Sequence, residues 1–451
     1  MNRSQTRPVA VVGGGVLGVS IAQQLARAGA DVVLVTESEL ASQASGRSLS
    51  WLNSAGRHSA HYHRLRMAGI DRYRTLFAQN PGLGWLRFDG GLAWPAEDRA
   101  EEVHRQHEHD LALGYDSHLL TADQVAAQVP GVDSDAIPVT EALWRPGEGW
   151  VDLPSLVRFL AEDLLAHGGR LMTDAGPTRV VTEGDQVAGV RTERGEWIAT
   201  EVAVLATGAA VPDMSAELGV TIPDASPVAL LVATTPLSHE LTAVLNTPRV
   251  SLRPRPDGSL AVDADWASAH VTSAGDGRYE VAQSVVEELL GEASRVLAGH
   301  PSLTAAWRGT GPKPIPGDGE PVLGRIEDIS GLHVAFTHSG ATLGLIVGEL
   351  VAYEIVHGTT HPMLADFGAR RFGQRYTGGM ETDPDAVAVL RRWEDAGGAW
   401  RVLARDGDAV TVGLYRCDGG EEVDRIVADE APLAPFLNGR NSSEDIGPRR
   451  A

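Results

Sequence analysis

The sequence predicts a mixed α/β fold with α+β character, in which a helix-covered parallel sheet is interrupted by an antiparallel insertion. Three observations lead to this prediction. Residues 8–36 read as a strand, a glycine turn, a helix and a second strand. Residues 225–265 read as antiparallel β structure with a Pro-Asp-Gly turn at 256–258. Residues 331–357 return to a strand and a helix, so the parallel sheet is expected to be discontinuous in sequence.

Composition and charge restrict the classes to which this chain can belong. Of its 451 residues, 43% are hydrophobic and 22% charged, which is ordinary for a globular protein with a large core. The net charge of −22, without a Lys- or Arg-rich block, disfavours nucleic acid and anionic membranes as partners. No apolar run reaches the roughly 18–20 residues that span a bilayer, and no signal-peptide pattern opens the chain. Cys417 is the single cysteine, so a reducing, cytoplasmic location is expected.

The glycine turn after the first strand has the pattern Gly13-x-Gly15-x-x-Gly18. The first glycine permits a tight turn, the second lets the backbone approach a pyrophosphate, and the third allows close helix–strand packing. Glu37 ends the second strand, at the spacing of an acid that accepts hydrogen bonds from a ribose. Its charge would repel a 2′-phosphate. The pattern therefore predicts a dinucleotide site and disfavours NADP.

The rest of the chain is read from periodicity and turn residues. Helices are expected over 16–27, 51–76, 154–167, 280–298 and 340–357, and further β structure over 179–204 and 331–336. Beyond about residue 378, alternating strands separated by Asp-Gly and Gly-Gly turns predict a small β module that serves packing or oligomer contact. Residues 441–451 have the composition of a disordered tail.

Four segments, in order, resemble one known family. They are the small, hydroxylated stretch at 37–48 (ESELASQASGRS), the meander and closing strand at 179–208, the turn GPKPIPGDGEPVLG at 311–324, and GLHVAFTHSGATLG at 331–344. Together they resemble the D-amino acid oxidase, glycine oxidase and sarcosine oxidase superfamily of FAD enzymes over about residues 7–370. The resemblance implies FAD as cofactor and a discontinuous Rossmann-like FAD-binding domain.

The domain boundaries follow from that resemblance. The FAD-binding domain is expected at 7–76, 143–215 and 309–370. An inserted antiparallel-sheet substrate domain is expected at 77–142 and 216–308, and the small C-terminal β module at 378–440.

The resemblance also implies cofactor contacts. The pyrophosphate would meet the glycine turn and the helix start, Glu37 the adenosine ribose, and Thr178 or its neighbour Val180 the adenine. The start of the last helix would face the N1–C2 carbonyl edge of the flavin, where fixed N–H dipoles stabilise the negative charge of reduction. The full set of expected cofactor residues is Gly13, Gly15, Val16, Leu17, Gly18, Glu37, Ser45, Arg47, Ser48, Thr178, Gly208, Gly340, Ala341, Thr342 and Leu343.

Lys313 is the only lysine in the chain and lies between Pro312 and Pro314, which restrict its backbone. In the family this position is normally an arginine that grips the substrate carboxylate, and lysine keeps the charge but not the planar fork. Lys313 is expected to meet an anionic substrate group, to pair with an internal acid, or to act as a neutral base. The alternative is a structural ion pair with Asp318 or Glu320, or simple exposure.

His338 precedes the last helix, where it would hydrogen-bond substrate or flavin, or else only the backbone. Trp51 and Asn53 are expected to border the flavin ring. Arg253 and Arg255 are interpreted either as alternative carboxylate ligands or as a solvated edge.

Three histidines, His58, His61 and His63, do not share one helical face, so no metal is expected. Covalent attachment of flavin to one of them is left open by analogy with some relatives. Attachment to Cys417 is disfavoured, because it lies in the C-terminal module.

The resemblance implies oxidation of the C–N bond of an amino acid or amine, with the flavin reoxidised by O2 and hydrogen peroxide released. One lysine cannot fill both lysine roles known from sarcosine oxidase, and Thr342 stands at about the second position. The alternatives are therefore a dehydrogenase with another electron acceptor, or a non-catalytic flavin-binding subunit. The partners expected are a small-molecule substrate and either a second copy of the chain or an electron acceptor.

Overall fold

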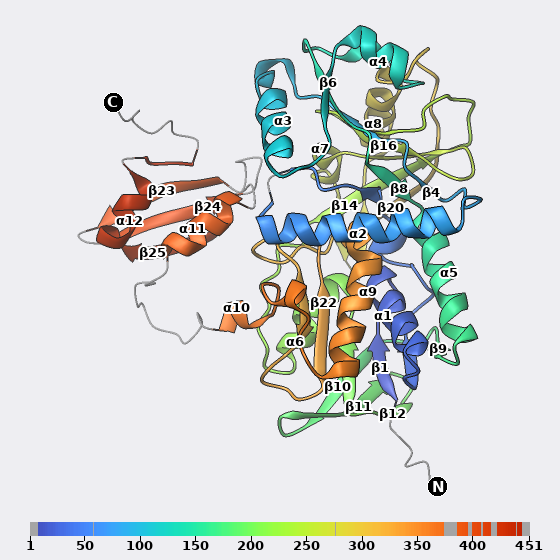
Figure 1. The fold of residues 1–451 in the computed structure, drawn as a ribbon, viewed down its shortest axis with the longest axis vertical. Coiled ribbons are helices and arrows are strands. Elements are labelled where there is room, and N and C mark those ends of the chain that lie inside the picture. Colours follow the sequence, from blue (N-terminus) through green and yellow to red (C-terminus); the bar gives the residue numbers. More distant parts are fainter. Residues whose placement is uncertain are drawn as a thin grey trace.

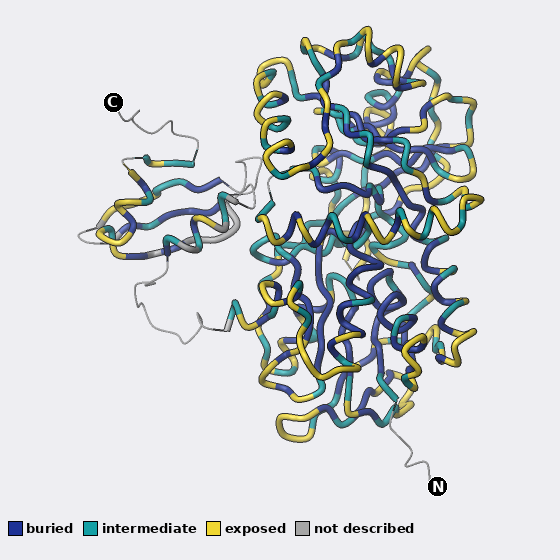
Figure 2. Tube along the Cα trace, in the orientation of Figure 1, coloured by how far each residue is buried: buried dark blue, intermediate teal, exposed yellow. Residues whose placement is uncertain are grey.

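The computed structural model describes residues 8–56, 58–275, 277–373, 386–395, 399–406, 409–415, 422–438 and 440–443. Two sheets dominate the body of the molecule, and helix α2 (Ala60–Gln79) crosses between them (Figure 1). Strands of both sheets are buried, whereas α2 is buried on one side and exposed on the other (Figure 2). The expected mixed α/β architecture is confirmed.

The first sheet has six strands and is parallel except at one edge. Val9 pairs with Val32 on one side and with Val202 on the other. These strands are almost entirely apolar, as expected where both faces of a parallel sheet are covered. Their order is β21 (Val322–Arg325), β22 (Leu332–Phe336), β13 (Val202–Leu205), β1 (Val9–Val12), β2 (Val32–Val35) and β9 (Arg170–Met172), with β21 antiparallel to β22.

Helices cover one face of this sheet and a small antiparallel sheet covers the other. The helices are α1 (Val16–Arg27), α5 (Leu153–Ala166) and α9 (Gly340–His357). The small sheet comprises β10 (Thr178–Glu183), β11 (Gln186–Thr192) and β12 (Trp197–Ala199). Helix α9 has the bounds expected from the sequence and packs against both α1 and α2.

The second large sheet has eight mostly antiparallel strands. Its order is β20 (Ala305–Pro312), β14 (Val228–Thr234), β17 (Leu260–Asp263), β16 (Ser251–Pro254), β15 (Val244–Asn246), β5 (Gly91–Ala93), β7 (Ala142–Arg145) and β6 (His118–Leu120). Strands β7 and β20 cross the boundaries expected at 143 and 309. Helix α8 (Gln283–Arg295) packs its apolar residues against this sheet.

The body of the molecule also contains shorter strands and helices. The strands are β3 (Trp51–Leu52), β4 (Leu86–Arg87), β8 (Gly149–Val151), β18 (Thr272–Gly275) and β19 (Arg278–Glu280). The helices are α3 (Glu102–Ala112), α4 (Ala122–Gln128), α6 (Val211–Ala216), α7 (Asp265–Ser268) and α10 (Arg370–Gly373).

The expected helix at 51–76 is wrong at its start. Trp51 pairs instead with Trp150 of β8, a partner distant in sequence. The helix begins only at Ala60, where the Ser59 hydroxyl caps it by accepting from Tyr62 N.

The C-terminal module contains the expected antiparallel β meander and also two helices that the sequence did not predict. Its sheet of β23 (Ala399–Asp406), β24 (Ala409–Tyr415) and β25 (Glu422–Asp429) packs with α11 (Ala386–Asp395) and α12 (Glu430–Leu437). Residues 441–443 are ordered, because Val402 N donates to Asn441 O at 2.7 Å and Ser443 N to Trp400 O at 2.9 Å. Residues 444–451, the rest of the expected tail, and Cys417 lie outside the described residues.

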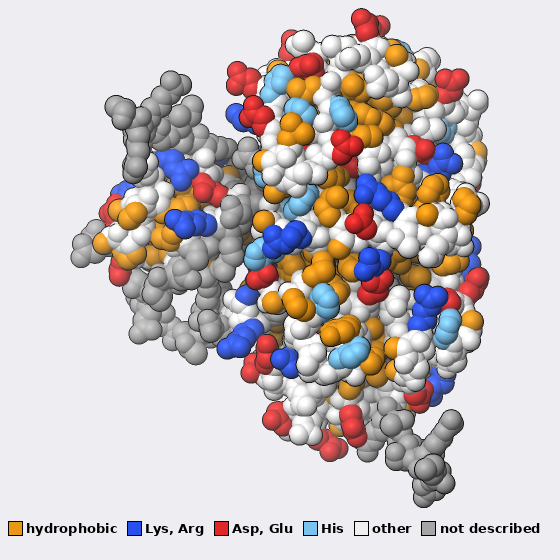
Figure 3. All heavy atoms as spheres, viewed as in Figure 1, with side chains coloured by type: hydrophobic (Ala, Val, Ile, Leu, Met, Phe, Trp, Pro, Cys, Tyr) orange, Lys and Arg blue, Asp and Glu red, His pale blue; other side chains and the backbone are white. Residues whose placement is uncertain are grey.

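Helix α9 is long and apolar enough to cross a bilayer by length and composition alone, with 18 residues and a mean hydropathy of 1.3. It is 67% buried in the fold, as a core helix is. On the face drawn in Figure 3, acidic and basic side chains are interspersed over both halves of the body.

Candidate functional site

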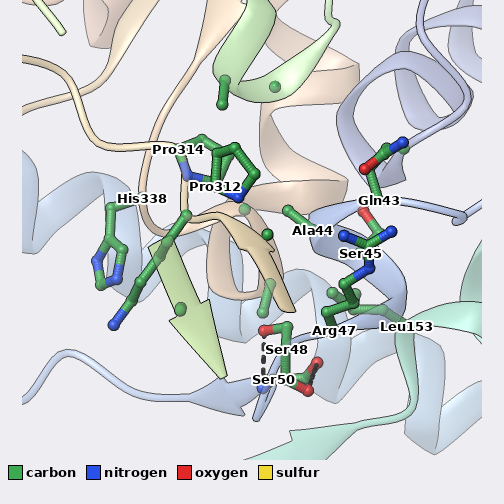
Figure 4. A pocket seen from close by; sticks show the side chains of 18 of the residues that line it. Gln43, Ala44, Ser45, Arg47, Ser48, Ser50, Leu153, Pro312, Pro314 and His338 are labelled. Atoms are coloured by element: carbon green, nitrogen blue, oxygen red, sulfur yellow. Dashed lines mark hydrogen bonds between the residues drawn. The ribbon is translucent and has the colours of Figure 1, made fainter. Parts of the chain in front are cut away.

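A cavity of about 940 Å³ lies where the carboxyl ends of the parallel strands meet the eight-stranded sheet. This edge is where open α/β sheets bind ligands. In Figure 4, Gln43, Ser45 and Arg47 lie on one side of the cavity and His338 on the opposite side. The same cavity therefore joins the glycine turn to the segments around Lys313 and His338.

The glycine turn between β1 and α1 is built as the sequence predicts. Gly13 has φ +121°, and a Cβ there would lie 2.3 Å from Ala206 O. A Cβ on Gly18 would lie 2.0 Å from Gly13 O, so Gly18 serves helix–strand packing and does not line the cavity. Gly13 and Gly15 do line it.

Backbone donors at the start of α1 are available to a ligand. Val16 N donates to Ser45 Oγ at 3.0 Å. The N–H groups of Gly14, Gly15 and Leu17 have no acceptor within the described part of the chain, and all three residues line the cavity. Free N–H groups at a helix N-terminus bind anions such as phosphate.

Glu37 and Thr178 line the same end of the cavity. A hydrogen bond of 3.0 Å from Gly176 N to Glu37 O joins their two segments. Thr178 Oγ1 donates to Gly176 O, also at 3.0 Å. Val180, the alternative to Thr178, belongs to the apolar core beneath the sheet.

The segment after β2 forms one wall. The Arg47 guanidinium donates to Ser42 O at 3.0 Å and to Thr310 O, so backbone carbonyls of two segments hold it at the cavity. Ser48 Oγ accepts from Ser50 N at 3.0 Å, the dashed line in Figure 4. These hydrogen bonds hold the side chains of Arg47 and Ser48 in place at the cavity wall.

The start of α9 forms the wall at the other end. Gly340, Ala341 and Thr342 line the cavity, as does Gly208 with its φ of +63°. Leu343 does not: its side chain is fully buried in the core and its N–H donates to Ser339 O within the helix.

Trp51 and Asn53 also line the cavity, beside α9. Thr342 Oγ1 lies 3.3 Å from Trp51 O and 3.4 Å from Asn53 N.

Lys313 follows β20 at the cavity wall, with its Nζ 3.8 Å from Asp265 Oδ1. The proposed partners Asp318 and Glu320 are wrong. Asp318 is paired with Arg371 at 2.7 Å, and the Glu320 carboxylate accepts from Ser59. The pairing was unpredictable because Asp265 comes from α7, far earlier in the chain.

Asp263 lines the cavity near Lys313. Burial raises the pKa of Asp263 to about 6, opposed by the positive charge of Lys313. Lys313 therefore faces two carboxyl groups at the cavity wall, those of Asp263 and Asp265.

His338 presents an uncharged imidazole to the cavity. Burial lowers its pKa to about 3, and the charges of Lys313 and Arg66 act in the same direction. Neither ring nitrogen has a hydrogen-bond partner among the residues that the structure describes. At neutral pH the ring can therefore donate one hydrogen bond and accept another.

Several candidates lie away from the cavity. His58 bonds Ala55 O, His61 pairs with Asp366, and His63 bonds Ser54 Oγ. None lines the cavity, and the described residues contain no cluster that could hold a metal.

Both interpretations of Arg253 are wrong. Its side chain is 2% exposed and donates to Leu49 O and to Pro254 O, so it braces the backbone instead of binding ligand or solvent. Arg255 lies 3.8 Å from Asp257 and does not line the cavity.

Sequence reasoning missed Arg66 and Ser339, which both line the cavity. One signal was available: Arg66 stands four residues from both Tyr62 and Ile70, on the apolar face of α2. An arginine in that position needs partners inside the fold.

The fold and this cavity define a protein of the dinucleotide-binding class. Residues 8–354 match the family described as FAD dependent oxidoreductase (DAO), and the chain belongs to this family. The family inferred from the four sequence motifs is confirmed, and the chain is an enzyme.

Three curated relatives illustrate the similarity. One subunit of the opine oxidase of Rhizobium meliloti is 24% identical over 80% of this chain and 96% of its own length. Glycine oxidase of Geobacillus kaustophilus is 25% identical with the same coverage. D-amino acid dehydrogenase of Cereibacter sphaeroides is 25% identical over 81% of this chain and 95% of its own.

Solved structures share the fold. The crystal structure of glycine oxidase from Geobacillus kaustophilus superimposes with a TM-score of 0.70 at 22% identity, covering 82% of this chain and 99% of that one.

Proposed function

We propose that the cavity binds FAD and a small amine together, and that the enzyme oxidises a C–N bond of an amino acid or amine to an imine. One observation carries the proposal: a single cavity extends from the glycine turn to Lys313 and His338. The names of the curated relatives, two oxidases and a dehydrogenase of amino acids or opines, support the substrate class.

The residues present fit FAD. The free N–H groups of Gly14, Gly15 and Leu17 suit the pyrophosphate, and a side chain on Gly13 would clash with Ala206. Glu37 and Thr178 suit the adenosine end. The donors of Gly340 to Thr342 suit the carbonyl edge of the flavin.

When bound, FAD supplies the redox chemistry, taking a hydride from the carbon that bears the amine and returning two electrons to an acceptor. The chain's residues orient the substrate. Lys313 provides positive charge for an anionic group on the substrate, and the uncharged ring of His338 hydrogen-bonds it. With its pKa lowered to about 3, His338 is a weak base, and hydride transfer requires the substrate amine in its neutral form.

We propose O2 as the electron acceptor, with release of hydrogen peroxide and hydrolysis of the imine by water. A dehydrogenase that uses another acceptor is the second candidate, favoured by the D-amino acid dehydrogenase relative. Rapid reoxidation of the reduced enzyme by air distinguishes the first from the second.

The test is an anaerobic titration of the purified flavoprotein with amino acids and their decarboxylated analogues. Bleaching of the visible flavin absorbance by any member of the panel supports amine oxidation. An FAD-loaded protein that no amine reduces would contradict the proposal and favour a non-catalytic flavin subunit.

Variants of Lys313 test its role in the same titration. If Lys313 holds a carboxylate, Lys313→Met raises the KM for amino acids by about tenfold or more and leaves that for the uncharged analogues unchanged. Lys313→Arg keeps the charge and should retain most of the affinity. Equal effects of Lys313→Met on both substrate types would exclude carboxylate binding by Lys313.

A further inference from the structure

The side chain of Arg66 is a buried positive charge at the α9 end of the cavity. Arg66 is only 6% exposed and lines the cavity. No carboxylate lies within 4 Å of its guanidinium in the described part of the chain. A buried charge without a counter-charge is costly, so its retention here needs an explanation.

Arg66 is held by three hydrogen bonds to two residues. Nε donates to Asn53 O at 3.1 Å, Nη2 to Asn53 Oδ1 at 2.8 Å, and Nη1 to Ser339 Oγ. A guanidinium has five N–H donors, so two remain available. Asn53 and Ser339 both line the cavity, which places these donors at its wall.

Ser339 lines the cavity and accepts two hydrogen bonds of this network. Its Oγ accepts from Arg66 Nη1 and also from Tyr62 Oη at 2.6 Å. A hydroxyl has two lone pairs and one hydrogen, so both lone pairs are occupied and only the hydrogen is left to bond. None of the described residues accepts it.

The charge of Arg66 is not offset by its neighbours. The nearby His58 and His338 are both uncharged, because burial and Arg66 itself lower the pKa of each, to about 2 and about 3 respectively. Ser339 is also the residue directly before α9, whose N-terminus carries a partial positive charge. The charge of Arg66, the dipole of α9 and the free hydroxyl hydrogen of Ser339 are therefore all found at the start of α9.

We propose that Arg66 and Ser339, with Tyr62, form a donor array that stabilises negative charge on the pyrimidine edge of the bound flavin and so raises its reduction potential. The inference rests on the proposed binding of FAD in this cavity. Arg66 acts through its hydrogen bond to Ser339 and through the electric field of its charge. It is therefore a positioning residue that also adjusts the reduction potential of the flavin. Its effect on the reduction potential of the flavin adds to that of the α9 dipole.

Sulfite provides the test without turnover. It adds to flavin N5, its electron pair forming the N–S bond, and the negative charge is taken up by the N1–C2 edge. Its dissociation constant therefore reports how strongly the protein stabilises that charge. The measurement is made on FAD-loaded wild type and on Arg66→Met, Arg66→Lys and Ser339→Ala, together with the flavin midpoint potential of each.

We expect Arg66→Met to weaken sulfite binding about tenfold or more and to lower the two-electron potential by about 30 mV for each factor of ten. Arg66→Lys should restore most of the affinity, and Ser339→Ala should weaken it by a smaller factor. The matched control is Arg72→Met on the same helix, because Arg72 is exposed and paired with Glu349. It should change neither quantity.

Unchanged sulfite affinity and midpoint potential in Arg66→Met would overturn the inference. If Arg66→Met instead raises only the KM for carboxylate substrates, Arg66 binds the substrate and does not act on the flavin. If Arg66→Met does not fold, unchanged sulfite affinity and potential in Ser339→Ala would overturn it equally. A wild-type protein that holds no flavin would instead refute the proposed function.

Discussion

At the residue scale, ionisable side chains set the charge of the cavity wall. Lys313 is the one lysine of the chain, and it sits opposite Asp263 and Asp265, not beside the acids of its own turn. Burial lowers the pKa of the uncharged His338, and the charges of Lys313 and Arg66, both within reach of it, lower it further. The site therefore combines fixed positive charge with a neutral hydrogen-bonding ring.

The neutral state of His338 predicts the pH dependence of the reaction. Only the free amine gives up hydride readily, so kcat/KM should rise with pH through the titration of the substrate amine. His338 titrates near 3, far below this range, and should add no step near its ordinary value of 6.5. Profiles of wild type and His338→Asn should differ in height but not in shape; a step near 6.5 that the variant abolishes would contradict this assignment.

Glu148 lies behind the cavity and predicts a pH-dependent stability. It is fully buried and accepts from Trp51 Nε1 at 2.8 Å and Tyr115 Oη at 2.6 Å. Burial raises its pKa from 4.5 to about 7, against the opposing charge of Arg145. The folded state thus keeps a proton that the unfolded chain loses, and the stability this contributes is lost as pH rises from 4.5 to 7.

Glu148→Gln removes that dependence. Relative to wild type, the variant should gain up to about 3 kcal/mol in free energy of unfolding between about pH 5 and pH 8. Urea unfolding of both proteins at the two pH values measures the difference. A difference that does not change with pH would show that Glu148 is ionised throughout.

Close packing of helices positions the site at the element scale. Helices α1 and α9 carry the two N-termini that face the cavity, and glycines let them approach each other. A Cβ on Gly348 would lie 2.1 Å from Ser20 Oγ, and one on Gly344 2.7 Å from Val16 Cγ2. Moving either helix moves the N–H donors that line the cavity.

Gly348→Ala should therefore destabilise the protein by about 1–3 kcal/mol and weaken retention of FAD. The matched control is Gly291→Ala in α8, where a Cβ meets nothing within 4 Å. That change should stabilise by about 0.5–1 kcal/mol, because alanine is the better helix former. Urea unfolding and flavin release on dilution compare the two, and equal effects would rule out tight α1–α9 packing.

Short-range sequence patterns predicted some elements correctly. The other elements depend on contacts between segments that are distant in the sequence. The glycine turn and α9 follow from short-range patterns, and the structure has them where the sequence predicts. The error at 51–59 arose because β3 forms only by pairing with β8, which no local pattern indicates. Asp265 and Ser339 were missed for the same reason, since their contacts depend on segments that meet only in the fold.

At the scale of the whole molecule, the cavity exists because two sheets made from interleaved parts of the chain meet along one edge. Strand β20 pairs with β14 in the eight-stranded sheet and then delivers Lys313 to the cavity wall. The next strands, β21 and β22, belong to the parallel sheet and lead into α9. One continuous stretch, 305–342, thus brings Lys313, His338 and the start of α9 to the cavity.

The most direct test of this account is a crystal structure of the protein with FAD bound. The account predicts the pyrophosphate on the N–H groups of Gly14, Gly15 and Leu17. It places the pyrimidine edge of the flavin at Ser339 and Gly340, and leaves Lys313 and His338 facing the ring. FAD bound elsewhere, or bound here with its pyrimidine edge turned away from α9, would contradict it.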